Sequence, residues 1–266
     1  MFNTHLWGSR MGSALTAIFC AFQLSAAQAV PFSSDISVTG NTTFDTSASF
    51  GGSGDFSLVS GGVTTTSTFT DSSVTVGANP LAGNLTDIND GVGFNGSASV
   101  TDDEFLIGFD TAMNVTNNSS DIFRVTINLA FDNLVNADGT DAYADSELVL
   151  KVNGVEIFFS DLISDTVYGD KEGGVSTGGA GEELSESGSF SSNFELNPAD
   201  VLVFDLIWTM EGGDYSGGLA NGELSAFLSV TSVEKAIASA PLPATFLLLA
   251  MGIILLSVQR RFRIRS

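Results

Sequence analysis

Residues 148–159 read LVLKVNGVEIFF, and this stretch decides the fold class. Two runs of apolar, β-branched and aromatic residues flank Asn153-Gly154, the two-residue turn that most favours a β-hairpin because both positions tolerate a positive φ. The turn places Val152 opposite Val155, Lys151 opposite Glu156 and Leu150 opposite Ile157. Apolar residues then meet apolar ones, and opposite charges meet across the strands. We predict a β-hairpin here.

The same pattern recurs outward from this hairpin. Between residues 30 and 234, short β-branched and aromatic runs alternate with Gly, Asn, Asp and Ser, without a sustained helical period. The clearest further strands are 122–131, 201–210 and 223–233, and weaker ones are 63–70, 92–100, 104–115 and 187–196. Residues 33–62 suit either an N-terminal subregion or an edge hairpin. We therefore predict one all-β domain over 30–234, a two-sheet, jelly-roll-like β-sandwich, followed by a linker over 235–240.

The composition excludes several classes of partner. The 266 residues hold 31 acidic and 9 basic residues, and 21 Phe make the chain too apolar for a disordered acidic tail. All the acids lie between Asp35 and Glu234, whereas residues 30–240 hold four basic residues, so this interval carries 4 minus 31, or −27. Such a surface repels nucleic acid and anionic lipid, and we expect neither as a partner.

The N-terminus has the three parts of a signal peptide, in order. Arg10 precedes the apolar residues 14–24, and Ala27 and Ala29 form a small-x-small cleavage site. The alternative is a buried helix that opens the domain. Residues 1–29 are therefore predicted to address the secretory machinery and to be removed with His5 and Cys20, the only His and Cys. A mature chain without them excludes Ser-His-Asp and Cys-His catalysis, Cys/His zinc sites, haem ligation and disulfides.

The C-terminus ends in an apolar segment and an arginine cluster. Residues 242–258 carry no charge, and as a helix they would span roughly 26 Å, enough for a thin hydrocarbon core. Basic residues follow between 260 and 265, which predicts a cytoplasmic tail and an acidic domain across the membrane. A plain transmembrane anchor is one interpretation.

The order of these C-terminal features resembles a PEP-CTERM sorting signal of the VPLPA type, with Ala240 in place of the usual Val. The residues that carry the resemblance are Ala240, Pro241, Leu242, Pro243, Ala244, Arg260, Arg261 and Arg263. It covers about residues 239–266, with the signal itself over 241–266. The resemblance implies a Gram-negative bacterium that makes extracellular polysaccharide, and removal of the tail by exosortase, an integral membrane protease. The two prolines cannot continue a helix, which leaves an extended stretch for cleavage.

Two acidic patterns in the body are candidate sites. Residues 136–141 (NADGTD) resemble part of a calcium loop, with Asp138, Asp141 and Asp145 as candidate ligands. Leu134 occupies the first ligand position, so an EF-hand is not predicted and a turn is favoured. Residues 102–104 (DDE) and 182–183 (EE) could supply the carboxylate pair of a glycoside hydrolase. Nothing in their spacing brings two of them together across a cleft, and in a chain with 31 acids such clusters are expected as solvated surface.

Alternating strand directions predict where the loops gather. From residue 122 onward, the connections 132–145, 161–187 and 211–221 should emerge at one end, and the turns at 153–154 and 197–198 at the other. The first end holds 13 of the 31 acids and the three tyrosines Tyr143, Tyr168 and Tyr215. Tyrosine rings suit sugar faces, and carboxylates suit calcium or sugar hydroxyls. The alternative is a set of mobile acidic loops.

These features together predict a non-enzymatic surface or matrix protein. It would be anchored in the inner membrane as a precursor, processed by an exosortase-like protease and then associated with extracellular polysaccharide at the cell surface or beyond. A calcium-dependent carbohydrate-binding module is the alternative, and a glycan-degrading enzyme is a third class. No cofactor other than calcium is expected.

Overall fold

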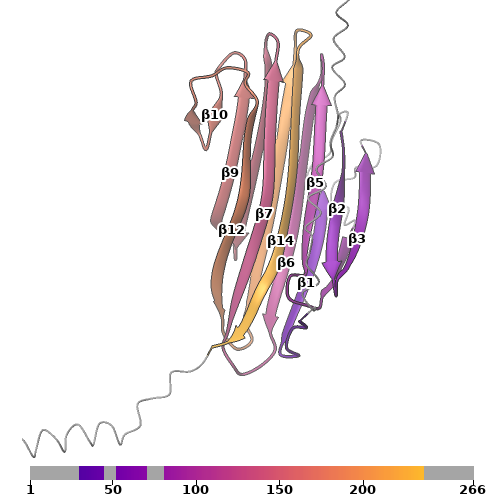
Figure 1. The fold of residues 1–266 in the computed structure, drawn as a ribbon, viewed down its shortest axis with the longest axis vertical. Coiled ribbons are helices and arrows are strands. Elements are labelled where there is room, and N and C mark those ends of the chain that lie inside the picture. Colours follow the sequence, from indigo (N-terminus) through magenta and orange to yellow (C-terminus); the bar gives the residue numbers. More distant parts are fainter. Residues whose placement is uncertain (1–29, 45–51, 71–80, 237–266) are drawn as a thin grey trace, which may run out of the picture.

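The protein is a sandwich of two antiparallel β-sheets (Figure 1). A computed structural model describes residues 30–44, 52–70 and 81–236, and every regular element in these ranges is a strand. The predicted all-β, two-sheet sandwich is confirmed.

The larger sheet has eight strands and the smaller has six. In spatial order, the larger sheet contains β11 (Val175–Ser176), β10 (Lys171–Glu172), β9 (Val155–Asp165), β8 (Ala142–Val152), β13 (Val201–Asp214), β6 (Glu104–Asn117), β1 (Ile36–Phe44) and β4 (Leu81–Leu85). The smaller sheet contains β12 (Leu184–Leu196), β7 (Phe123–Asp138), β14 (Leu219–Lys235), β5 (Gly91–Val100), β2 (Gly52–Ser60) and β3 (Val63–Thr70).

The core lies between the sheets, where alternate residues of each strand point inward. Trp208 is fully buried, and its ring centroid lies 4.8 Å from that of Phe109 and 5.6 Å from that of Phe94. The Trp208 indole N–H donates a hydrogen bond of 2.8 Å to Ser146 Oγ, which satisfies the ring's polar group. Gly96 leaves room for this ring, because a Cβ there would lie 3.1 Å from it.

The hairpin at Asn153-Gly154 forms as predicted near its turn. Both turn residues have positive φ, 49° and 79°, and Val152 pairs with Val155 and Lys151 with Glu156. The predicted pairing of Leu150 with Ile157 is wrong. A bulge between Leu150 and Lys151 shifts the register, so that Leu150 pairs with Phe158. The shift turns the Phe158 ring toward Phe131 and Phe190, at centroid distances of 4.9 and 5.4 Å.

Several strands run further than predicted. β7 continues to Asp138, β13 continues to Asp214, and β14 spans Leu219–Lys235. The predicted linker therefore starts too early. Lys235 pairs with Phe123 and forms an ion pair with Asp121, and the Ala236 N–H donates to the carbonyl oxygen of Ile122. The short strands β4, β10 and β11 were not predicted.

Two predicted segments lie outside the described residues. They are the signal peptide 1–29, with Ala27 and Ala29, and the sorting signal 241–266. Across 30–44, 52–70 and 81–236, the chain has no helix of the length and apolarity that a bilayer span requires.

Candidate functional site

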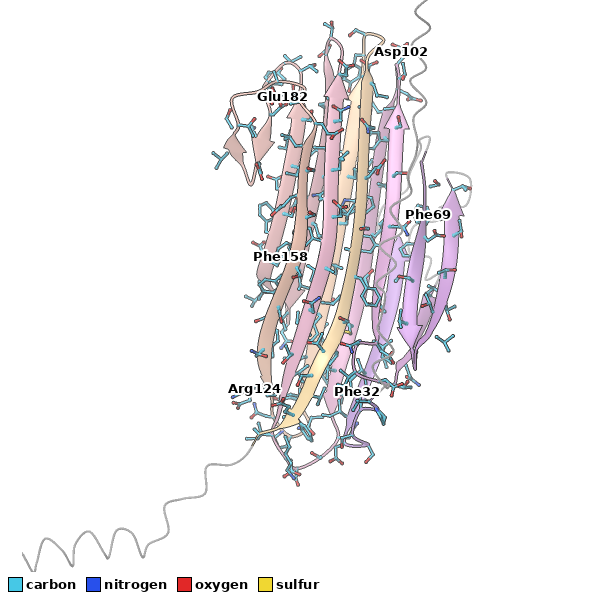
Figure 2. The ribbon with its side chains drawn as sticks, in the orientation of Figure 1. Phe32, Phe69, Asp102, Arg124, Phe158 and Glu182 are labelled. Carbon is cyan, nitrogen blue, oxygen red and sulfur yellow. The ribbon has the colours of Figure 1, made fainter. Side chains whose placement is uncertain are left out.

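Four connections meet at one end of the sandwich, which we call the loop end. They are residues 101–103, 139–141, 166–183 and 215–218. The strand registers bring them together, because Val100 pairs with Ala220, Asp138 with Leu219 and Tyr143 with both Asp165 and Gly213. The predicted gathering of three of these connections is confirmed, and the turns at 153–154 and 197–198 lie toward the opposite end. Figure 2 shows Asp102 and Glu182 at the loop end and Arg124 at the other.

Two of the three candidate tyrosines come together there. Tyr143 is half-buried at the start of β8, and Tyr215 is 57% exposed just after β13. The two side chains are hydrogen-bonded to each other, and the Tyr215 hydroxyl also donates to Glu104 Oε1. The bond to Glu104, followed by burial, raises the pKa of Tyr215 to about 12. Burial, then the charges of Glu211 and Glu104, raises the pKa of Tyr143.

The sequence singled out Glu104 only as a candidate carboxylate for glycoside hydrolysis, and its association with the tyrosines was not predicted. Glu104 lies 111 residues before Tyr215 and meets it because β6 and β13 pair, with Glu104 opposite Gly213. The Tyr143 ring covers the same glycine, since a Cβ at Gly213 would lie 3.2 Å from a Tyr143 ring carbon. The resulting group, Tyr143, Tyr215 and Glu104, is called the tyrosine pair site below.

Tyr168 stands apart from this group. It lies in the turn after β9 and is 86% exposed, while its backbone N–H donates to Asp165 Oδ1 at 2.8 Å. Among the described residues, the hydrogen bonds of Tyr168 do not reach the tyrosine pair site. The structure therefore places all three tyrosines at one end but joins only two of them.

A buried carboxylate connects the loops beside the tyrosine pair. Asp214 is 1% exposed, and it accepts backbone N–H groups from Asp102 at 3.1 Å and from Ser216 at 3.2 Å. Burial acts to raise the pKa of Asp214, but these bonds, with those from Gly217 and Gly218, outweigh it and hold the pKa below its ordinary value. The carbonyl oxygens of Asp141 and Thr140 accept hydrogen bonds from Tyr215 N–H and Ser216 Oγ. Loops 101–103, 139–141 and 215–218 are thus bonded to one another.

A second buried carboxylate organises the long connection 166–183. Asp170 is fully buried, and its side chain accepts the N–H groups of Asp165, Gly181 and Glu182 at 2.7 to 3.0 Å. The backbone N–H of Asp170 donates to the carbonyl oxygen of Gly179, and the carbonyl oxygen of Asp170 accepts from the N–H of Thr177. This network, with β10 and β11, makes the connection an ordered flap rather than an irregular loop. The sequence offered no signal for the role of Asp170, because its partners surround it only once the chain has folded back.

The candidate calcium ligands are placed differently from one another. Asp138 ends β7, and Asp141 lies in the connection to β8 with a φ of 64°. Asp145 is a strand residue on the outer face of the larger sheet, opposite Ile163 and Glu211. Within the three described ranges, no group of three or more acidic side chains is placed to hold a metal ion. Calcium binding stays a prediction.

Asp145 has an unusual electrostatic environment. Burial first, and then the charges of Asp161, Glu211 and Glu147, raise the pKa of Asp145 to about 7, while Lys171 opposes the shift. Burial also raises the pKa of Asp161, against a bond from the Gly174 N–H and the charge of Lys171. The outer face near the loop end therefore holds a proton on Asp145 under mildly acidic conditions.

The carboxylates considered for glycoside hydrolysis lie at the loop end and are exposed. Two shallow hollows of the described surface lie elsewhere, over β1 and β4. One is lined by residues that include Phe32 and Ile36, and the other by residues that include Asn41 and Asn114. Neither hollow has an acidic lining residue. The carboxylates considered for glycoside hydrolysis therefore do not line either hollow.

No family model matches the chain, and no curated protein matches it. Among solved structures, it has a weak similarity to one described as infectious bursal disease virus Gt strain. The identity is 7% over 81% of this chain and 71% of the other, with a TM-score of 0.14. For the VP2 subviral particle of the same virus, the identity is 10% over 85% and 73% of the chains, with a TM-score of 0.15. Likeness at this level carries no argument about function.

Proposed function

We propose that the chain is an exported, non-enzymatic surface or matrix protein. An exosortase-like protease sorts it through residues 241–266, and the released jelly-roll-like sandwich associates with extracellular polysaccharide. The observation that carries the proposal is the succession Pro241–Leu242–Pro243, uncharged residues to 258 and arginines at 260, 261 and 263. It follows a sandwich that needs no cysteine, because its stability comes from a large apolar core.

The direction of the sandwich supports this proposal. β14 ends at Lys235 opposite Phe123, at the end of the molecule away from the loops (Figure 1). A chain held by its C-terminal segment would therefore direct its loop end away from the membrane. That orientation leaves the tyrosine pair site accessible to polymer outside the cell.

Intact mass of the protein recovered from its own host tests the proposal. We expect a mature species that begins near Val30 and ends between Pro241 and Ala244. Replacement of both Pro241 and Pro243 with Ala should leave the tail uncleaved, whereas replacement of the exposed Pro198 with Ala should not. A surface species that retains Arg260 to Ser266 would support a plain anchor and contradict sorting.

A carbohydrate-binding module is the second candidate, and the tyrosine pair site favours it. Two aromatic rings and a carboxylate on one exposed surface can contact a sugar face and its hydroxyl groups. Replacing Tyr143, Tyr168 and Tyr215 with Ala should then reduce binding to the host polysaccharide at least tenfold, with the melting temperature nearly unchanged. Tyr168→Ala alone is the matched control, because Tyr168 lies outside the pair. Unaltered binding by the triple variant would exclude this site.

A further inference from the structure

The smaller sheet ends in a long strand, one edge of which is unpaired among the described residues. β12 pairs with β7 over thirteen residues without a register shift, and no described strand pairs with its other side. It forms one lateral border of the sandwich in Figure 1. An edge of this length presents a row of backbone donors and acceptors to another strand.

The hydrogen bonds around β7 show which β12 residues direct these groups outward. The carbonyl oxygen of Ile127 accepts a bond from Ser191 on β12, whereas those of Thr126 and Asn128 accept bonds from β14. Odd-numbered β7 residues thus direct their backbone groups toward β12, where their partners are even-numbered, as Ser192 is for Ile127. The odd-numbered residues of β12 direct theirs away from β7.

The side chains along this edge do little to prevent pairing. Residues 184–196 (LSESGSFSSNFEL) contain no Lys, Arg or Pro, which commonly protect edge strands. The only charges are Glu186 and Glu195, near the two ends. The half-buried rings of Phe190 and Phe194 contact Phe158 and Phe204 of the opposite sheet, so an apolar seam lies along the open side of the sandwich.

We propose that β12 is a self-association edge that pairs antiparallel with β12 of a second copy of this chain. The twofold axis passes through Phe190, so that each Phe190 lies opposite its counterpart. The other opposed residues are Ser189 with Ser191, Ser187 with Asn193, Ser185 with Glu195, Glu186 with Phe194 and Leu184 with Leu196. The two smaller sheets then form one continuous sheet of twelve strands.

This register suits both charge and side-chain size. No carboxylate lies directly opposite another, whereas a shift that paired Glu186 with Glu195 would be destabilising. Odd-numbered residues, which direct their backbone groups outward, oppose odd-numbered ones, so the second copy satisfies these groups. The Phe190 pair extends the apolar seam across the axis. The pairing is independent of how the chain is sorted.

Sedimentation of the full chain in a non-ionic detergent at 0.15 M NaCl tests the proposal, and three proteins are compared. The unaltered chain and Ser189→Ala should dimerise alike, because both retain the outward N–H. Ser189→Pro removes that N–H without breaking a bond to β7 and should weaken dimerisation at least tenfold. Equal association of Ser189→Pro, or a monomeric unaltered chain, would overturn the proposal.

A spin-label measurement keeps the test decisive if Ser189→Pro folds poorly. In a Cys20→Ser background, labels on Ser191→Cys should lie within about 10 Å of each other and broaden the spectrum. Labels on Ser225→Cys, an exposed position of β14, should lie more than about 20 Å apart and show no broadening. Broadening at both positions, or at neither, would exclude β12 pairing.

Discussion

Asp145, on the outer face of the larger sheet, makes the free energy of unfolding depend on pH. Its folded-state pKa of about 7 lies above the ordinary value of 3.8, so the folded protein binds this proton more tightly than the unfolded chain. The stabilisation of the folded state by this bound proton is complete below about pH 4 and is lost as the pH rises through 7. A shift of this size corresponds to about 4 kcal/mol in full, and solvent screening reduces it to roughly 1–2 kcal/mol at this partly exposed position.

Asp145→Asn should therefore raise the free energy of unfolding at pH 8 by about 1–2 kcal/mol and change it little at pH 4. Urea unfolding at the two pH values measures the difference. The exposed Asp132, on the smaller sheet, offers a matched Asp132→Asn control. A gain from Asp145→Asn that is larger at pH 4 than at pH 8 would contradict the environment described for this carboxyl.

The structural role of some residues can be predicted from the sequence, and that of others cannot. Asn153 and Gly154 were predictable because the conformation they need is local. Asn133 was not, because it is fully buried in β7 and its amide donates to the Ser146 carbonyl oxygen at 3.3 Å and to Ser160 Oγ at 3.2 Å. Those partners lie on β8 and β9 of the opposite sheet. The predicted strand stopped at Phe131, before this buried polar residue, whereas β7 continues to Asp138.

Among the elements, the flap of β10 and β11 depends most on one side chain. Asp170→Ala removes the acceptor of three backbone N–H groups, which should lower the local stability of residues 165–182 by about 2–4 kcal/mol. Amide hydrogen exchange should accelerate at Asp165, Gly181 and Glu182 while β7 and β14 remain protected.

Asp170→Asn provides the matched control for this element, since it keeps one acceptor oxygen and should give a smaller acceleration. Unchanged exchange in Asp170→Ala would show that the flap is held by its backbone pairs, Lys171 with Ser176 and Glu172 with Val175. The candidate site, like this flap, depends on contacts between residues that are distant in the chain. The loops could be assigned to one end from strand alternation, but Glu104 could be joined to Tyr215 only by the pairing of β6 with β13.

For the whole molecule, the positions of most long strands and their alternating directions were accessible from local patterns, but the short strands and the strand order were not. β6 lies between β13 and β1, and β5 lies between β14 and β2. Paired residues of β5 and β14 are more than a hundred positions apart in the chain, as Val100 and Ala220 show. Many apolar strands could have filled those places with similar burial. The strand order depends on packing across the core, such as that of Trp208 over Gly96. This packing involves several strands, so it cannot be predicted from any single segment of the sequence.

The net charge of the body makes its thermal stability depend on bound cations. Residues 30–240 carry a formal −27, and the described part of this body is a single sandwich whose acids lie mostly on its surface, so self-repulsion opposes folding. Divalent cations that bind the folded surface would relieve this repulsion by mass action, beyond the screening that any salt provides.

We expect millimolar calcium to raise the melting temperature by several degrees more than sodium chloride of matched ionic strength. Differential scanning calorimetry of the full chain, with a magnesium arm at the same concentration, measures the effect. A larger shift with calcium than with magnesium would indicate carboxylate coordination, whereas equal shifts in all three salts would show that screening alone stabilises the fold.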